Sequence, residues 1–318
     1  MSWAFLFPGQ GSQKVGMLTE WRTVYPQETD DLFAKVNRIC SADLLRLALE
    51  GPEEELSMTA NAQPIILATS FLIFELLRRH VSDEMVSVVA GHSLGEYSAL
   101  CVAQSMSFEE AIFLVRKRGE LMQEAMPKGT GAMVALIGLP MEGVETLVAL
   151  LNQSGQGRVE IANLNSSDQV VLSLPKVLVS QTMERAKELG CKKAVELKVS
   201  APFHSSYMEE AARRFLEVLN AISLRRPRYR YISNVTASYV EDPEEIKVLL
   251  ARQMTSPVRW KEIMEVLYRG GYRRVVEVGP GMVLSKLFER EYPEGKVFSL
   301  HAPKNMQLFL SEVGKDGF

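Results

Sequence analysis

Residues 91–95 read Gly-His-Ser-Leu-Gly, and this segment constrains the possible folds of the chain more than any other. The apolar run 85–90 before it predicts a buried strand, and residues 96–104 after it have the composition of a helix. A serine on so sharp a turn adopts a strained backbone and exposes its side chain, because only glycine-sized neighbours let strand and helix approach. Ser93 is therefore a candidate nucleophile. The motif alone leaves open a glycine-rich turn with an inert serine.

Other buried strands end in turn signals in the same way. Residues 3–7 form a continuous apolar run that stops at a Pro-Gly turn, and residues 274–278 run into Gly-Pro-Gly. A further strand is expected at 229–234 and a helix at 258–268. Buried strands that alternate with helices are typical of an α/β fold with a mainly parallel central sheet. Together with the serine turn, they predict a large α/β-hydrolase-like core.

The middle of the chain has a different order of predicted strands and helices. The pattern predicts, in order, strand 132–137, helix 141–152, strand 159–164, strand 169–174, helix 177–189 and strand 193–199. This βαββαβ order is ferredoxin-like. We expect a small insert domain over 129–199, beside a large catalytic domain made of 1–128 and 200–318. A cleft between two domains is a common ligand site.

The candidate nucleophile requires a base, and the chain has four histidines. His80 ends a predicted helix, where a C-capping residue is expected in any case, and His301 lies near the C-terminus. His92 is next to the serine, but neighbours in a tight turn point apart. His204 lies between a strand and the helical run 207–220, where a loop would present a base. We predict His204 as the base, and a helix-capping role is the alternative.

Arg118 breaks the amphipathic pattern of the predicted helix 108–126. A helical wheel places it within the apolar face, opposite the other charged residues of the helix. That face consists of Phe108, Ala111, Ile112, Leu114, Val115, Gly119, Leu121, Met122, Ala125 and Met126. A buried guanidinium needs a partner, because leaving it desolvated and alone costs several kcal/mol. The partner is either an internal acid, which is the commoner case, or a substrate anion.

Composition and charge argue against several classes of protein. The 36 Lys and Arg residues against 39 Asp and Glu give a net charge of -3, which is no basis for binding nucleic acid. Three widely spaced cysteines favour neither a disulfide framework nor a zinc site. The N-terminus lacks the basic region of a signal peptide, and the longest apolar stretch, 64–77, is too short to span a bilayer. We expect a cytoplasmic protein with no metal and no membrane partner.

Six motifs occur in the order seen in malonyl-CoA:acyl carrier protein transacylases, and the chain resembles that family over nearly its whole length. They are FPGQGSQ (7–13), GHSLGEYSAL (91–100), RKRGELMQ (116–123), APFH (201–204), RQMTSPVRW (252–260) and VEVGPG (276–281). Six ordered motifs are far more specific than a lone G-x-S-x-G. The resemblance implies transfer of malonyl from malonyl-CoA to the phosphopantetheine thiol of holo acyl carrier protein, for fatty acid synthesis.

The resemblance also implies roles for the matching residues. Ser93 would be the nucleophile, His204 the general base and acid, and Arg118 the two-pronged partner of the malonyl carboxylate. Gln10 and the backbone N–H of Leu94 would form the oxyanion hole. No acid would orient the histidine, since the family uses a main-chain carbonyl near the position of Gln253.

Further residues are implied as substrate contacts. Phe203 resembles the malonyl-selecting form of its loop, where bulk beside the histidine leaves little room for an α-methyl group. Asn163 and Asn165 match polar insert-domain positions near the thioester arm, and Met122 belongs with the substrate-binding residues. The implied enzyme has no permanently bound cofactor and acts as a monomer. The basic pairs 192–193, 213–214 and 225–226 are candidate docking sites for an acidic carrier protein.

Two other functions fit part of the sequence. A serine hydrolase shares the serine turn and the histidine, but it explains neither Arg118 on an apolar face nor Gln10 in its glycine-flanked turn. A non-catalytic carrier-binding subunit would keep the fold and not need Ser93. The sequence also leaves open a polyketide pathway in place of fatty acid synthesis.

Overall fold

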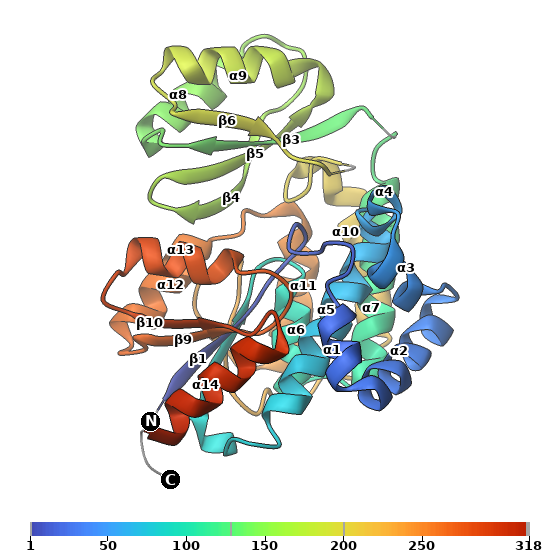
Figure 1. Cartoon of the computed structure of the whole chain (residues 1–318). Coiled ribbons are helices and arrows are strands. Elements are labelled where there is room, and N and C mark those ends of the chain that lie inside the picture. The colour runs from blue at the N-terminus through green and yellow to red at the C-terminus, as the bar shows by residue number, and fades with distance from the viewer. Residues whose placement is uncertain (1, 128, 200, 316–318) are drawn as a thin grey trace.

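The computed structural model describes residues 2–127, 129–199 and 201–315, and these residues form two sheets, each with its own helices (Figure 1). The larger sheet has the order β10-β9-β1-β2-β7-β8. Its strands are β1 (Trp3–Phe7), β2 (Val86–Gly91), β7 (Arg230–Ile232), β8 (Tyr239–Val240), β9 (Arg274–Glu277) and β10 (Lys296–Ser299). All neighbours pair in parallel except β8, which is antiparallel to β7. The predicted mixed α/β fold with a mainly parallel sheet is therefore confirmed.

Strand β1 shows why these strands are apolar throughout. All five of its residues are buried, because helices cover both faces of the sheet. Phe5 and Phe7 belong to the core on one face, whereas Ala4 and Leu6 face the opposite way, toward α12 (Trp260–Arg269) and α13 (Val283–Glu291). The alternation follows the two-residue period of a strand.

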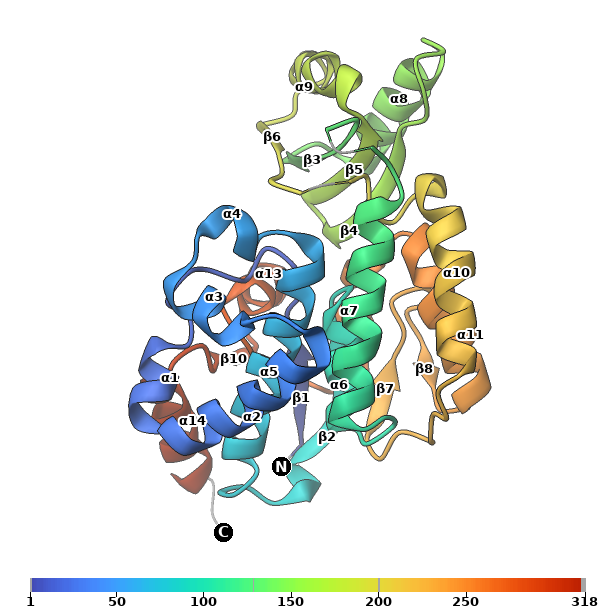
Figure 2. The same cartoon turned by 90° about the vertical axis from the view of Figure 1, so that its right-hand side faces the viewer.

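The helices around the large sheet form two groups. The helices on the face of Phe5 and Phe7 are α1 (Thr19–Val24), α2 (Pro26–Cys40), α3 (Leu44–Glu50), α4 (Glu53–Leu56), α5 (Thr59–Leu77), α6 (Gly95–Val102), α7 (Phe108–Glu124), α10 (Glu209–Asn220), α11 (Pro243–Arg252) and α14 (Pro303–Lys315). On the other face lie α12 (Trp260–Arg269) and α13 (Val283–Glu291). Figure 2 shows α5, α6 and α7 stacked beside β1 and β2.

Helix α5 corrects one expectation from the sequence. It begins at Thr59, five residues before the apolar stretch 64–77, and it is long and apolar enough to cross a membrane. The sequence estimate was too short because it excluded the first turns of the helix. Of its most apolar window, 83% is buried inside the protein, where α5 packs against α7 and α6. Helix α5 is thus a central helix of the core.

The smaller sheet is antiparallel, with the order β4-β5-β3-β6. Its elements are β3 (Gly131–Ile137), α8 (Met141–Asn152), β4 (Glu160–Ser166), β5 (Gln169–Pro175), α9 (Val179–Glu188) and β6 (Lys193–Glu196). They occur in the predicted βαββαβ order. Val134 and Leu136 of β3 pack under α8 and α9, whereas Met133 and Ala135 face the large core.

The last strand of this sheet is shorter than predicted. Strand β6 ends at Glu196, three residues before the expected end. The N–H of Leu197 still bonds to the carbonyl of Met133, but the N–H of Val199 bonds to the carbonyl of Leu197. The chain therefore turns away from β3 at this point.

Backbone pairing joins the two parts of the molecule. The N–H of Val258 donates to the carbonyl of Ala162 at 2.9 Å, and the N–H of Leu164 donates to the carbonyl of Val258 at 2.9 Å. These bonds attach β4 to the segment just before α12. These backbone bonds, in addition to the two connecting segments, hold the smaller sheet in position above the core.

Candidate active site

Ser93 lies at the carboxyl end of β2, on the predicted turn. Its backbone has φ of 50°, in the left-handed region that a non-glycine residue rarely adopts. The flanking glycines are required by close contacts. A Cβ on Gly91 would lie 1.9 Å from the carbonyl of Gly95, and a Cβ on Gly95 would lie 1.9 Å from the carbonyl oxygen of Phe7. The strained turn predicted from the sequence is therefore present.

Asn234 holds this turn, and sequence reasoning missed it. Its Oδ1 accepts the N–H of Ser93 at 2.7 Å, and its Nδ2 donates to the carbonyl of Gly91 at 2.6 Å. The side chain is fully buried just beyond β7. A polar residue at the carboxyl end of a buried strand was the available signal, because these strand ends meet at one edge of the sheet.

His204 reaches Ser93, as its assignment as a base requires. Its Nε2 lies 2.8 Å from Ser93 Oγ, and its Nδ1 lies 2.8 Å from the carbonyl oxygen of Gln253. Because a carbonyl can only accept, Nδ1 carries the proton and Nε2 is free to accept one from the serine. His92 points elsewhere and pairs with Oδ1 of Asn165 at 2.8 Å. The bonds of His204 do not fit the alternative of a helix cap.

The surroundings keep His204 neutral. Burial, together with the positive charge of Arg118, lowers the pKa of His204 to about 3. The side chain is 4% exposed. Its imidazole is therefore unprotonated at neutral pH and able to act as a base.

This lowered pKa predicts a flat pH dependence. From pH 6 to pH 5, the neutral fraction of a histidine with its ordinary pKa falls roughly eightfold. The neutral fraction of His204 should hardly change. We expect the rate at which Ser93 reacts with phenylmethylsulfonyl fluoride, an uncharged reagent, to be nearly equal at the two pH values. Intact-mass spectra taken over time measure it, with Ser93→Ala as the blank. An eightfold drop would show that the pKa of His204 is not lowered.

Arg118 is 1% exposed, which confirms its predicted position on the buried face of α7. Its Nη1 donates to Oε1 of Gln63 at 2.9 Å, and its Nη2 donates to Oε1 of Gln253 at 2.7 Å and to Ser93 Oγ at 3.1 Å. Its guanidinium also lies 5.4 Å from the centre of the Tyr97 ring. In the described part of the chain, no carboxylate lies within 4.0 Å of the guanidinium. The Nε of Arg118 is buried without a hydrogen-bond partner there.

The contacts of Arg118 settle the question of an internal ion pair. Its partners are neutral oxygens, two of which belong to glutamine side chains that the sequence did not indicate as arginine partners. Gln63 is fully buried on α5, and a buried glutamine in an apolar helix was the signal. A guanidinium held by neutral groups beside a nucleophile can still accept an anionic partner.

Gln253 links most of this site, and both its backbone and its side chain take part. Its carbonyl accepts from His204, and its side-chain Oε1 accepts from Arg118. Its Nε2 donates to the carbonyl of Ser93 at 2.9 Å and to Oε2 of Glu96. The resemblance implied the backbone carbonyl near this position, but not these side-chain bonds.

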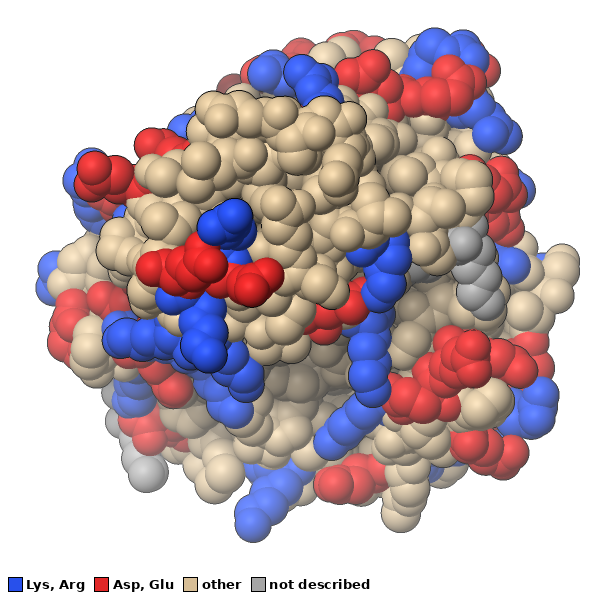
Figure 3. Space-filling view, turned by 90° about the horizontal axis from the view of Figure 1, so that it is seen from above, with Lys and Arg blue, Asp and Glu red and all other residues tan. Residues whose placement is uncertain are grey.

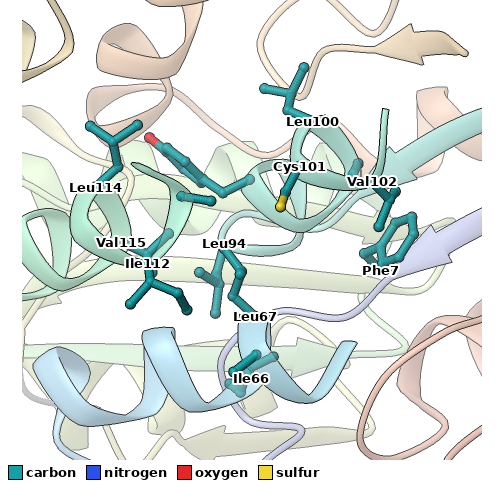
Figure 4. Packing of buried hydrophobic residues seen from close by; sticks show 14 of the residues in the cluster. Phe7, Ile66, Leu67, Leu94, Leu100, Cys101, Val102, Ile112, Leu114 and Val115 are labelled. Atoms are coloured by element: carbon teal, nitrogen blue, oxygen red, sulfur yellow. The ribbon is translucent and has the colours of Figure 1, made fainter. Parts of the chain in front are cut away.

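The groups expected around an oxyanion are only partly in place. Among the described residues, the N–H of Leu94 has no acceptor, while its side chain packs in the core near Leu67 and Ile112 (Figure 4). This N–H lies just before the first residue of α6 and next to Ser93. Gln10 lines the neighbouring cavity, and its Nε2 donates to Oγ1 of Thr59 at 3.4 Å.

A cavity of about 360 Å³ lies between the large core and the smaller sheet. Its lining includes Gln10, His92, Asn163, Asn165, Lys198 and Val283. The two asparagines therefore line this cavity. Phe203 and Met122 are instead buried, at 6% and 1% exposure, and the sulfur of Met122 lies 3.7 Å from Nε2 of Gln63. Within the described residues, no cluster of three or more His, Cys, Asp or Glu side chains could hold a metal ion.

Comparison with known proteins identifies the family of the chain. Residues 4–306 match the acyl transferase domain family. The chain is 39% identical to the malonyl CoA-acyl carrier protein transacylase of Bacillus subtilis, over 98% of each chain, and 41% identical to that of Haemophilus influenzae, over 90% of this chain and 91% of the relative.

Solved structures agree with these relatives. A malonyl-transacylase in complex with its type II PKS acyl-carrier protein superposes with a TM-score of 0.93 at 37% identity, over 98% of this chain and 100% of that one. The FabD of Acinetobacter baumannii gives 0.92 at 40% identity, over 99% and 98%. The family match, the near full-length identity and the superposition together show that this chain belongs to the malonyl-CoA:acyl carrier protein transacylases of the acyl transferase family.

Proposed function

We propose that this chain transfers the malonyl group of malonyl-CoA to the phosphopantetheine thiol of a holo acyl carrier protein, supplying malonyl carrier protein for fatty acid synthesis. The position of Arg118 carries the proposal, because its Nη2 lies 3.1 Å from Ser93 Oγ. In a malonyl thioester, one methylene separates the free carboxylate from the reacting carbonyl. A buried cation beside the nucleophile matches that short spacing. An acetyl group has no carboxylate to offer it.

In the first half-reaction, Ser93 Oγ attacks the thioester carbonyl while His204 Nε2 takes its proton. The carbonyl oxygen becomes an oxyanion, for which we propose the N–H of Leu94 and the side chain of Gln10 as donors. Gln10 would have to exchange its bond to Thr59 for the oxyanion. When the carbon–sulfur bond breaks, the CoA sulfur receives the proton from His204, and a malonyl ester remains on Ser93.

The second half-reaction runs through the same groups. His204 takes the proton of the phosphopantetheine thiol, whose sulfur attacks the ester carbonyl. Breaking the carbon–oxygen bond returns the proton to Ser93 and leaves malonyl on the carrier. Neither half-reaction changes an oxidation state, so the proposal includes no bound cofactor. Water must be kept from the ester, since hydrolysis would waste the intermediate.

The remaining assignments concern substrate contacts. We propose that Asn163 and Asn165, which line the cavity, contact the thioester arm of CoA or of the carrier. Phe203 and Met122 would shape the acyl pocket from within the core. In the described part of the chain, Asn165 is the one of these four residues whose side chain has a hydrogen bond to the serine turn, to Nε2 of His92.

The proposed partner is a carrier protein, and the solved complex of a related malonyl-transacylase with its carrier supports it. The view from above, in Figure 3, shows charges of both signs interspersed. Arg213 and Arg226 already pair with nearby glutamates. Lys192 and Lys193 are exposed at the start of the edge strand β6, after which the chain continues to the cavity residue Lys198. This favours the pair 192–193 as the docking cluster.

The finer description of the architecture is also a proposal. We assign 1–128 and 200–318 to an α/β-hydrolase-like catalytic domain, and 129–199 to a ferredoxin-like insert domain. The strand order β4-β5-β3-β6 supports the second name. Residues 1, 128, 200 and 316–318 lie outside the described residues. We further propose that the protein is a cytoplasmic monomer.

Intact mass spectrometry tests the proposed function. The protein is mixed separately with malonyl-CoA and acetyl-CoA, and holo carrier protein is then added. We expect a malonyl adduct that persists without carrier, a far smaller acetyl adduct, and transfer of the malonyl mass to the carrier. Release of free malonate at the same rate with and without carrier would identify a hydrolase instead, and a protein that gains no adduct would be a non-catalytic subunit.

A further inference from the structure

We infer that Glu96 is a positioning residue for malonyl recognition, because its carboxylate fixes the orientation of the Gln253 side chain, which in turn orients Arg118. The inference rests on the proposed function. Glu96 is 1% exposed, on the first turn of α6, three residues after the nucleophile.

The first step concerns the amide of Gln253. An amide has a donor end and an acceptor end. The donor end faces two acceptors, the carbonyl of Ser93 and Oε2 of Glu96, and the acceptor end faces Nη2 of Arg118. If the amide turned over, its NH₂ would face the guanidinium and its oxygen would face the carboxylate and the carbonyl. Each of the three contacts would then be unfavourable, so Glu96 helps to select the observed orientation.

The second step concerns Glu96 itself. Its carboxylate accepts from the N–H of Asn234 at 2.9 Å, from the hydroxyl of Tyr231 and from Nε2 of Gln253. Burial raises the pKa of Glu96 to about 7, while these three donors favour the ionised form. At pH 8 the group is therefore mainly an acceptor.

The third step concerns charge. No carboxylate lies within 4.0 Å of Arg118 in the described part of the chain, yet the negative charge of Glu96 acts on it across the Gln253 amide, through space. A direct ion pair would occupy guanidinium hydrogens that a substrate carboxylate needs. With one amide between them, the acid partly compensates the buried charge, and the Nε of Arg118 keeps no hydrogen-bond partner among the residues described.

Glu96→Gln changes this arrangement without changing its size. If the new amide keeps its oxygen toward the N–H of Asn234, its NH₂ faces the NH₂ of Gln253 and favours the reversed orientation. If it turns over, its NH₂ faces the N–H of Asn234. Tyr231 can adapt by rotating its hydroxyl, but the backbone N–H cannot. Either way, a donor meets a donor.

The test is the ratio of malonyl to acetyl acylation rates of Ser93, followed by intact mass at pH 8 in wild type, Glu96→Gln, Gln253→Leu and the double variant. We expect Glu96→Gln to lower the ratio roughly tenfold, within the range of coupled neighbours. Gln253→Leu keeps the backbone carbonyl that orients His204. In its background, Glu96→Gln should have a much smaller effect on the ratio, because only the through-space attraction between Glu96 and Arg118 is then lost.

Tyr231→Phe is the matched control, since it removes one donor to Glu96 and leaves the carboxylate facing Gln253. It should change the ratio less than threefold, as expected for one hydrogen bond with a remaining network. A merely structural role for Glu96 would lower both rates together and leave the ratio unchanged, which would overturn the inference. Equal ratios in Tyr231→Phe and Glu96→Gln would overturn it too. If Glu96→Gln fails to fold, an unchanged ratio in Gln253→Leu decides against it. The wild-type protein tests the proposed function separately, through its preference for malonyl.

Discussion

Ser93→Ala protein mixed with malonyl-CoA is expected to gain no malonyl mass. The substitution removes the attacking oxygen, together with its contacts to His204 and Arg118. Loss of a catalytic serine typically lowers turnover by roughly 10⁶-fold. The fold should persist, because alanine meets the same backbone strain as serine and the N–H of residue 93 keeps its bond to Asn234. Intact mass measures the adduct, and thermal unfolding checks the fold.

Ser98 supplies a matched control for this experiment. It lies on α6, five residues after Ser93, is buried, and its Oγ has no hydrogen-bond partner among the described residues. Ser98→Ala should therefore acylate as wild type does. A malonyl adduct on Ser93→Ala protein would assign the nucleophile to another residue.

Arg118→Ala should greatly reduce the preference for malonyl over acetyl groups. Losing one partner of a desolvated charged contact costs about 2 to 5 kcal/mol, or roughly thirtyfold to several thousandfold in the rate of malonyl acylation. Acetyl acylation should stay level or rise, because the acetyl group leaves the guanidinium unpaired in wild type. Arg118→Lys should rescue malonyl acylation only in part, since a point charge cannot reproduce a two-pronged contact. Acyl-Ser93 formation from both thioesters measures the effect.

Arg116→Ala is the control for the helix. Arg116 is two residues away, pairs with Glu120 and bonds to the carbonyl of Ala60, so its loss should leave the malonyl preference unchanged. Equal losses of malonyl and acetyl acylation in Arg118→Ala would mean that Arg118 is structural, and the carboxylate contact would have to be withdrawn.

The sequence predicted the parts of this site that depend on local patterns. The strained turn at Ser93 follows from two glycines between a strand and a helix, and the burial of Arg118 follows from its place on a helical wheel. The ranking of His204 over the other histidines needed only its loop. Each of these inferences depends on residues that are close together in the sequence, within one or two secondary-structure elements.

The groups that support the site were not predictable in the same way. Glu96 and Asn234 are 138 residues apart, and Gln253 and Ser93 are 160 apart. A single polar residue in an apolar segment does not identify its partner, because that partner is chosen by the packing of distant elements. The resemblance supplied the backbone carbonyl of Gln253 but not its side-chain bonds. The end of β6 was also not predictable from composition. The strand ends because the chain turns away from β3, although the residues that follow are still typical of a strand.

The chain order of these elements bears on how the protein is made. The nucleophile and its cation precede the smaller sheet in sequence, whereas the base and Gln253 follow it, 111 and 160 residues after Ser93. Strand β9, which borders the central β1, comes later still. During synthesis, the ribosome releases the serine turn long before its base, before β7, which pairs with β2, and before β9. The nascent protein therefore carries an inert serine, and reactivity toward thioesters arises only near the end of translation, when the carboxyl-terminal third completes the sheet.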